Sequence, residues 1–273
     1  MGEINNVLIS TVKSPLVINA ARFALKLFPN AIFHVVSVIR KLRFRFLYIP
    51  HYSRIMERLA EEALRDIEKV LFNNGCLTVR RALLYGEPAK EIIKYVSTNS
   101  IDLAVVTSST TTSPPIDVLG SVASKIIAGL KIPTLVYTPF SDKVLDKDRV
   151  ETIALVAQDL DQLSKIIPLA TTIAKRHRSE LNLFTMESGE LPETTGNFLR
   201  SSGVRFKLKQ LISSTSEELV NEILRLGTST DLIIVKRFES LIRRSIYGIL
   251  ARRELELHER VLLGMSPSPI IIV

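Results

Sequence analysis

The sequence predicts an α/β protein with two tandem domains, each an open five-stranded parallel sheet with helices on both faces. Short apolar runs alternate along the chain with segments whose apolar residues recur at helical spacing, which is typical of a parallel sheet covered on both sides. The order of these segments occurs twice within 273 residues. Because that length fits two domains of about 130 residues, we expect a duplicated domain with an internal pseudo-two-fold axis.

The first half contains five apolar runs with strand character. A helical pattern begins at Pro15 after the first run, because proline suits the first turn of a helix. After the second run, Ser53 is predicted to cap a long amphipathic helix that Gly75 ends. A third helix follows the turn Gly86-Glu87-Pro88, and a fourth precedes the last run. The predicted strands are 7–9, 31–38, 77–84, 101–106 and 133–137.

The second half repeats this order more loosely. The stretch Glu222-Ile223-Leu224-Arg225 before Asp231 matches Glu91-Ile92-Ile93-Lys94 before Asp102. Ser214 to Glu217 resembles a capping box at a helix start. The polar segment between the halves is the predicted linker, so we expect domains at 1–140 and 151–273 with a linker at 141–150. The predicted strands are 152–157, 181–184, 204–212, 231–235 and 269–273.

Composition restricts the class of protein. A hydrophobic content of 46% allows ordinary cores. No apolar run approaches the roughly 20 residues that span a membrane, and no signal peptide is visible, so we do not expect an integral membrane protein. The one cysteine, Cys76, cannot form an internal disulfide and favours a reducing cytoplasm. The net charge of +8 either favours acidic partners or serves solubility alone.

The sequence shows no arrangement of catalytic or metal-binding residues. It contains no Cys/His pair, Ser-His-Asp order, zinc-protease motif or Walker loop. The four histidines are scattered, and His34 lies inside an apolar run where a core role is expected. We therefore predict no metal site and no catalytic residues, and we expect a protein that is not an enzyme.

One loop has the position of a phosphate site without its usual glycines. It follows the fourth strand of the first half and leads into a helix, whose first N–H groups and dipole can hold an anion. Hydroxyl residues stand at Thr107, Ser108, Ser109 and Thr110, and Gly120-Ser121-Val122 opens the helix. The loop is either an altered site for phosphate or another small anion, or a polar loop bonded to itself.

These elements together resemble the tandem universal stress proteins. The resemblance is carried by the turn Gly86-Glu87-Pro88-Ala89, the strand at 101–106, Gly120-Ser121-Val122 and the closing strand at 132–136, and it extends more weakly over 151–273. It implies a Rossmann-like fold of the adenine nucleotide alpha hydrolase type, with a nucleotide-sized crevice at the carboxyl ends of the strands. It also implies pairing of two such domains, here within one chain.

The family's ATP-binding pattern is only partly present. The pattern is Gly, two residues, Gly, nine residues, then Gly followed by Ser or Thr, with an Asp after the first strand. The two earlier glycines are Thr107 and Thr110 here, and the Asp is Val12. Only Gly120-Ser121 fits, so the motif is degraded. We expect no cofactor, while ATP or AMP remains an alternative ligand of Gly120-Ser121-Val122.

The second half keeps different parts of the pattern. Asp159 stands where the family has its Asp, and it is either a ligand residue or a helix N-cap, the reading that we prefer. Gly248 resembles the final glycine, but Ile249 follows it. Lys236 and Arg237 occupy the glycine-rich turn, where their charges would attract phosphate.

A basic and aromatic stretch offers a third kind of contact. Arg40, Lys41, Arg43 and Arg45 alternate with apolar residues, so they are candidates for binding nucleic acid or an anionic membrane surface. The alternative is a segment that packs its aromatic side chains on the protein or against a second chain. The sequence thus predicts a cytoplasmic stress-response or regulatory binding protein, with an unknown protein partner or a homodimer. An ATP or AMP sensor and a basic adaptor are the alternatives.

Overall fold

The computed structural model describes residues 3–12, 14–40, 50–108, 119–213, 215–237 and 255–273. In the first half the strands are β1 (Asn6–Ser10), β2 (Ile32–Ile39), β3 (Val79–Tyr85), β4 (Leu103–Thr107) and β5 (Thr134–Tyr137), and the helices are α1 (Pro15–Leu27), α2 (Pro50–Asn73), α3 (Pro88–Thr98) and α4 (Ser121–Gly129). In the second half the strands are β6 (Thr152–Ala157), β7 (Glu180–Thr185), β8 (Phe206–Gln210), β9 (Leu232–Val235) and β10 (Ile270–Ile272), and the helices are α5 (Leu160–His177), α6 (Glu193–Ser202), α7 (Ser216–Ser229) and α8 (Leu257–Met265).

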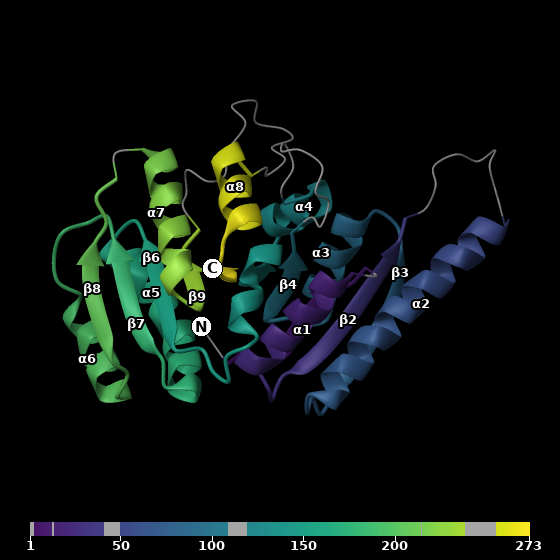
Figure 1. The fold of residues 1–273 in the computed structure, drawn as a ribbon, viewed down its shortest axis with the longest axis horizontal. Coiled ribbons are helices and arrows are strands. Elements are labelled where there is room, and N and C mark those ends of the chain that lie inside the picture. Colours follow the sequence, from purple (N-terminus) through teal and green to yellow (C-terminus); the bar gives the residue numbers. More distant parts are fainter. Residues whose placement is uncertain (1–2, 13, 41–49, 109–118, 214, 238–254) are drawn as a thin grey trace.

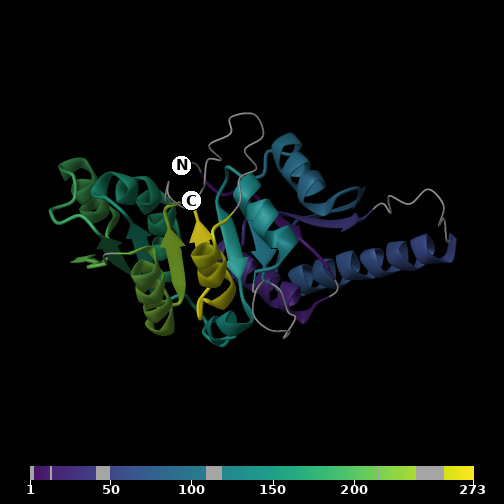
Figure 2. The same ribbon diagram turned by 90° about the horizontal axis from the view of Figure 1, so that it is seen from above.

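The two predicted five-stranded parallel units are present, and they join into one ten-stranded sheet. Its order is β3-β2-β1-β4-β5-β10-β9-β6-β7-β8. Every pair of neighbours is parallel except β5 and β10, which run antiparallel and meet at the junction of the halves. Figures 1 and 2 show the two halves side by side with the C-terminal strand between them. Each half therefore covers one edge strand of the other, which removes two open sheet edges.

Helices cover both faces of this sheet. Alternate residues of each strand point to opposite sides, so Val7 packs toward α1 and α2 while Leu8 packs toward α3 and α4. In the second half α5 and α6 continue the first layer, and α7 and α8 continue the second (Figure 1). Near-continuous apolar strands are what a sheet buried on both faces requires.

An aspartate anchors the start of the sheet in each half. Asp102 Oδ2 accepts hydrogen bonds from the N–H groups of Asn5 and Asn6, at 2.9 and 2.8 Å. Asp231 Oδ2 accepts from the N–H groups of Glu151 and Thr152, at 2.8 and 3.2 Å. The two residues belong to the internal match found in the sequence. That match therefore reflects the same role in both halves, which is to accept the backbone N–H groups at the start of the first strand.

Two predicted helix starts are wrong. The helix α2 begins at Pro50, so Ser53 lies inside it and is not its cap. Proline at a first helical position is favoured because its φ is already helical and its missing N–H has no partner to lose. The α7 cap is Thr215, whose hydroxyl accepts from the Glu218 N–H at 3.1 Å, so the N-cap lies one residue after the predicted one.

The segment predicted to link the domains is structured. A 3₁₀ helix, η1, spans Pro139–Val144 and is capped by Thr138. Val144 and Val150 are buried, and the Lys26 ammonium of α1 donates to the carbonyl oxygens of Val144 and Leu145 at 3.0 and 3.3 Å. The segment is therefore packed on α1 and fixes how the halves meet, and the domain limits stay a prediction.

Candidate functional site

A cavity of about 300 Å³ lies where β1 and β4 end and α4 begins. The carboxyl ends of the strands of an open parallel sheet are the usual place for a ligand crevice. The cavity brings together six of the residues predicted from the sequence, namely Val12, Thr107, Ser108, Gly120, Ser121 and Val122. It is completed by Ser10, Ser14, Val106, Leu119, Ala123 and Ile126.

The start of α4 presents backbone donors to this cavity. Gly120 is the N-cap residue, with φ at +85°, a conformation that glycine adopts without strain. In the described part of the chain no side chain caps the helix there. The first N–H groups of a helix lack intrahelical partners and carry the positive end of the dipole. Ser121, the first helical residue, is exposed, so this end of the helix can receive a hydrogen-bond acceptor or an anion.

Ser108 is the most unusual polar residue of the cavity. Its backbone N–H donates to the Tyr137 carbonyl oxygen at 3.0 Å, which extends the pairing of β4 with β5 by one residue. Its side chain is buried, with the residue 4% exposed, and the hydroxyl has no hydrogen-bond partner in the part of the chain that the structure describes. A buried hydroxyl without a partner loses its hydration with no compensation, so it favours any ligand that bonds to it.

The remaining wall is apolar, and none of the described lining residues is charged. Val12 stands at the mouth with 66% of its surface exposed, where the ATP-binding pattern has a carboxylate. The nearest cation on α4, Lys125, is not among the lining residues and lies 4.0 Å from Glu87. The cavity therefore combines hydroxyl and N–H donors with a neutral, mostly apolar surface.

The structure does not bring Asp159 of the second half to this cavity. Asp159 is the N-cap of α5, and its Oδ1 accepts from the Gln162 N–H at 2.6 Å, which agrees with the helix-cap reading. Gly248 lies outside the described residues, as do Ser109 and Thr110 of the first half.

Arg237 has a structural role at the junction of the halves. Its guanidinium donates to the carbonyl oxygens of Ile127 and Leu130, both at 2.9 Å. These carbonyls end α4, where a helix lacks internal donors and favours positive charge. The expectation that Arg237 attracts phosphate is therefore not met by this geometry, since both terminal nitrogens are committed to α4.

The start of α8 is the second-half counterpart of the start of α4. Here Glu259 Oε2 accepts from the backbone N–H of Glu256, and Glu259 is only 4% exposed. Burial raises the pKa of the Glu259 carboxyl to about 8, and the neighbouring Glu256 charge adds to that shift. The bond from the Glu256 N–H and the charge of Arg237 act in the opposite direction. The protein's own carboxyl group thus occupies this helix start.

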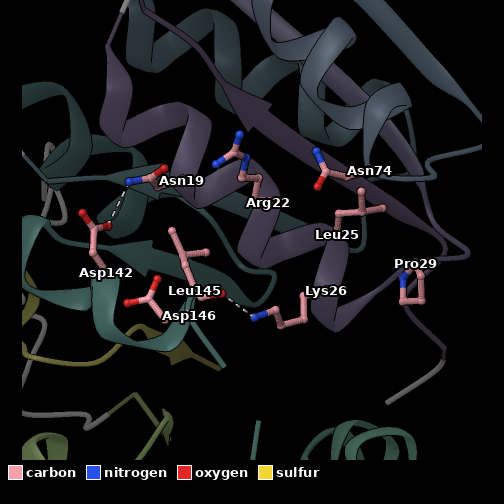
Figure 3. A pocket seen from close by; sticks show the side chains of 9 residues that line it. All are labelled: Asn19, Arg22, Leu25, Lys26, Pro29, Asn74, Asp142, Leu145 and Asp146. Atoms are coloured by element: carbon pink, nitrogen blue, oxygen red, sulfur yellow. Dashed lines mark hydrogen bonds between the residues drawn. The ribbon is translucent and has the colours of Figure 1, made fainter. Parts of the chain in front are cut away.

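A larger hollow of about 630 Å³ lies between α1 and η1, away from the strand ends (Figure 3). Asn19 donates to Asp142 at 3.1 Å across it, and Lys26 reaches the Leu145 carbonyl (Figure 3). Asp142 also accepts from the buried Tyr137 hydroxyl at 2.9 Å. These polar groups hydrogen-bond to one another. We therefore interpret the hollow as the packing boundary between α1 and η1 and not as a ligand site.

The other singled-out residues have structural surroundings. His34 is fully buried, with Nδ1 3.1 Å from the Tyr95 hydroxyl and Nε2 3.4 Å from Asn6 Oδ1. Burial and the Arg80 charge lower its pKa, which keeps the ring neutral and confirms its core role. Cys76 is buried, and among the described residues no three His, Cys, Asp or Glu side chains gather as metal ligands. None of the helices in the described ranges combines the length and apolar character that crossing a membrane needs.

Of the basic candidates only Arg40 can be placed. It is exposed just after β2, while Lys41, Arg43 and Arg45 lie outside the described residues, so their contact with nucleic acid or a membrane stays a prediction.

Sequence reasoning missed Ser10 and Ser14 as cavity residues. Ser14 caps α1 by accepting from the Leu16 N–H at 3.3 Å, and a serine directly before Pro15 was a usable signal for it.

The comparisons with known proteins agree with this architecture. Residues 4–138 match the universal stress protein family. A universal stress protein from Archaeoglobus fulgidus DSM 4304 is similar in structure at a TM-score of 0.73 and 18% identity, over 99% of this chain and 96% of that one. A putative universal stress protein from Pseudomonas aeruginosa UCBPP-PA14 gives a TM-score of 0.58 and 13% identity, over 99% and 93%. No curated protein matches the sequence. Through residues 4–138 the chain belongs to the universal stress protein family, and its fold is that of a tandem member with two such units.

Proposed function

We propose that this chain is a non-catalytic regulatory binding protein of the stress response, and that the cavity at the start of α4 holds a small ligand. The observation that supports it is the convergence of two features: the buried Ser108 hydroxyl, which has no partner among the described residues, and the helix start at Gly120 and Ser121, which no described side chain caps. Binding without turnover fits this cavity, because none of its described lining residues is a titratable acid, base or metal ligand.

The altered motif argues against ATP as the preferred ligand. Thr107 fills the place of the first glycine, and Val12 offers no acceptor where the pattern has a carboxylate. An ATP or AMP sensor is the second candidate, favoured by the position of Gly120-Ser121 at the helix start. We place the protein in the cytoplasm because its single cysteine has no partner within the chain. We expect it to act through a protein partner or a second copy of itself.

The test is a thermal-shift and calorimetric screen of the full chain at low salt, with AMP, ATP, Mg-ATP, nucleosides and small carboxylates as probes. Ser121→Phe puts a ring at the exposed mouth of the cavity and is expected to abolish binding of any probe that the wild type holds. Lys125→Phe puts the same ring on the same helix, at a side chain that is 64% exposed and not part of the cavity wall, and should leave binding intact.

Three results would contradict the proposal. If no probe binds at millimolar concentration, or if Ser121→Phe and Lys125→Phe bind alike, the cavity is not a ligand site. Release of phosphate from ATP at a steady rate would instead show an enzyme. Micromolar binding of AMP or ATP that Ser121→Phe abolishes would select the sensor.

A further inference from the structure

We infer that the cavity at the start of α4 is built for a small apolar monocarboxylate and not for a phosphorylated ligand. The inference rests on the proposed function, since it names the chemical class of the ligand in the same cavity. It follows from three properties of the lining: its charge, its donors and its apolar wall.

The positive charge available at the cavity is small, so it suits a ligand with a single negative charge. A helix start contributes about half a positive charge, whereas a phosphate monoester carries about −1.5 to −2 at neutral pH. None of the described lining residues is cationic, and the chain has no Lys, Arg or His from 103 to 124. Lys13, between two lining residues, is outside the described residues and is the one cation in the sequence from 10 to 14. A polyphosphate would therefore enter with most of its charge uncompensated.

The donors suit the two oxygens of a carboxylate. No side chain from the described ranges caps the N–H groups at the start of α4. The Ser108 hydroxyl lies in the same lining, buried and without a partner among the described residues. An ionised acceptor gains about twice as much from such donors as a neutral one, so an anion is preferred over a neutral polar ligand.

The apolar part of the cavity wall favours a ligand whose uncharged portion is apolar. Val106, Leu119, Val122 and Ile126 line the cavity together with Ala123. Its volume of about 300 Å³ is at the lower end of the range for small-molecule sites. A short branched or aromatic group would bury apolar surface against these side chains, which a ribose or an inorganic ion cannot do to the same extent.

Calorimetry of the full chain at matched ionic strength tests the inference, with isovalerate and benzoate as carboxylates. The probes for comparison are 3-methylbutan-1-ol, which has the body of isovalerate without its charge, inorganic phosphate, AMP and Mg-ATP. We expect the carboxylates to bind at least about tenfold more tightly than the alcohol, because a hydrogen bond to a charged group is worth more than one to a neutral group. Ser108→Ala is expected to weaken carboxylate binding by about tenfold or more for the same reason.

Thr171→Val is the matched control. Thr171 also has a buried hydroxyl without a partner among the described residues, but it lies on α5 in the other half. Both variants remove a hydroxyl that bonds to none of the described residues, so both should keep the melting temperature, and only Ser108→Ala should change binding. Equal affinity for isovalerate and the alcohol overturns the inference.

The remaining outcomes separate the inference from the proposed function. Binding of AMP, Mg-ATP or inorganic phosphate without the carboxylates, lost in Ser121→Phe, leaves the proposed function standing and overturns the inference. If no probe binds in this experiment or in the screen above, both the inference and the proposed function are overturned. A carboxylate affinity that is the same in wild type, Ser108→Ala and Ser121→Phe shows that binding occurs elsewhere and also overturns the inference.

Discussion

Ser108 and Arg237 occupy the same place in the two halves and are used in opposite ways. Each lies six residues after the anchoring aspartate of its half, and their N–H groups donate to Tyr137 and Val273 at 3.0 and 2.9 Å. The Ser108 hydroxyl lines a cavity and has no partner in the part of the chain that the structure describes, whereas the Arg237 guanidinium donates to the end of α4. The first half thus has a position available for a ligand where the second half has a contact that joins the halves.

The helix starts differ in the same way. α4 begins at Gly120 without a side-chain cap, and α8 begins with the carboxyl group of Glu259 bonded to the Glu256 N–H. Both ends have the same unsatisfied donors, because every helix start has them. The two halves therefore share the arrangement of their sheet and differ at the carboxyl ends of their strands, where the first half has the cavity proposed to hold a ligand.

The comparison can be tested first at the anchoring aspartates, which both halves share and where the largest effect is expected. Asp231 is 4% exposed, accepts two backbone N–H bonds and lies 2.8 Å from the Lys147 ammonium. Asp231→Ala leaves these donors without a partner, and we expect it to lower the free energy of unfolding by roughly 3 kcal/mol. Urea unfolding followed by circular dichroism measures the change.

Asp102→Ala should cost less, roughly 1 to 2 kcal/mol, because Asp102 is half-buried and its described bonds are to two N–H groups alone. Asp161→Ala is the surface control, since that side chain is 87% exposed and lies 4.0 Å from Lys165. It should change the stability by less than about 0.5 kcal/mol. Equal losses for Asp231 and Asp102 would mean that burial and Lys147 add nothing to the second anchor.

The succession of strands and helices within each half was predictable, because it follows from apolar periodicity and from the internal match around Asp102 and Asp231. The joining of the halves was not. The pairing of β5 with β10 depends on two short apolar runs that look the same whether they lie at a free edge or at a shared one. The structure of the predicted linker segment was not predictable for a related reason: Val144 and Val150 stand among polar residues, and their burial depends on packing against α1.

The cavity was predictable in part. Thr107, Ser108, Gly120 and Ser121 were identified because the strand, loop and helix order places them at one sheet end. Two features could not be predicted from the sequence: that the Ser108 hydroxyl has no partner among the described residues, and that Arg237 donates to the end of α4. Both depend on residues far away in the chain. The α2 start was missed since Pro50 and Ser53 are both acceptable first-turn residues, and sequence alone does not rank them.

Arg237→Met sharpens the comparison at the junction, with a smaller expected effect. The change keeps much of the apolar stem and removes the two bonds to Ile127 and Leu130, so we expect a loss of roughly 2 kcal/mol in the free energy of unfolding. Hydrogen exchange should also speed up in the last turn of α4. Arg225→Met is the matched control, because Arg225 is 78% exposed and pairs within its own helix with Glu222. If both variants lose the same stability, Arg237 does not tie the halves together.

Glu259→Gln tests the filled helix start and carries the smallest expected effect. The folded-state pKa of about 8 lies above the ordinary value of 4.5, so the folded protein keeps the proton while the unfolded chain loses it. Stability from this group is therefore fully present below about pH 4.5 and falls as the pH rises toward 8. Glutamine keeps an oxygen for the Glu256 N–H without the ionisation, so the variant should be more stable than wild type at pH 8.5, by about 1 kcal/mol or more, and equal to it near pH 4.

The control for this pH dependence is Glu222→Gln, a change at a partly exposed side chain on α7. Chemical unfolding of the three proteins at pH 4, 6 and 8.5 gives the curves to compare. If Glu259→Gln follows the wild type in parallel at all three values, folding does not raise the pKa of this carboxyl above its value in the unfolded chain. Burial at the start of α8 would then not be what sets the protonation of Glu259. If the curves diverge as expected, the second half holds a neutral cap at low pH and the contrast with α4 widens as the pH rises.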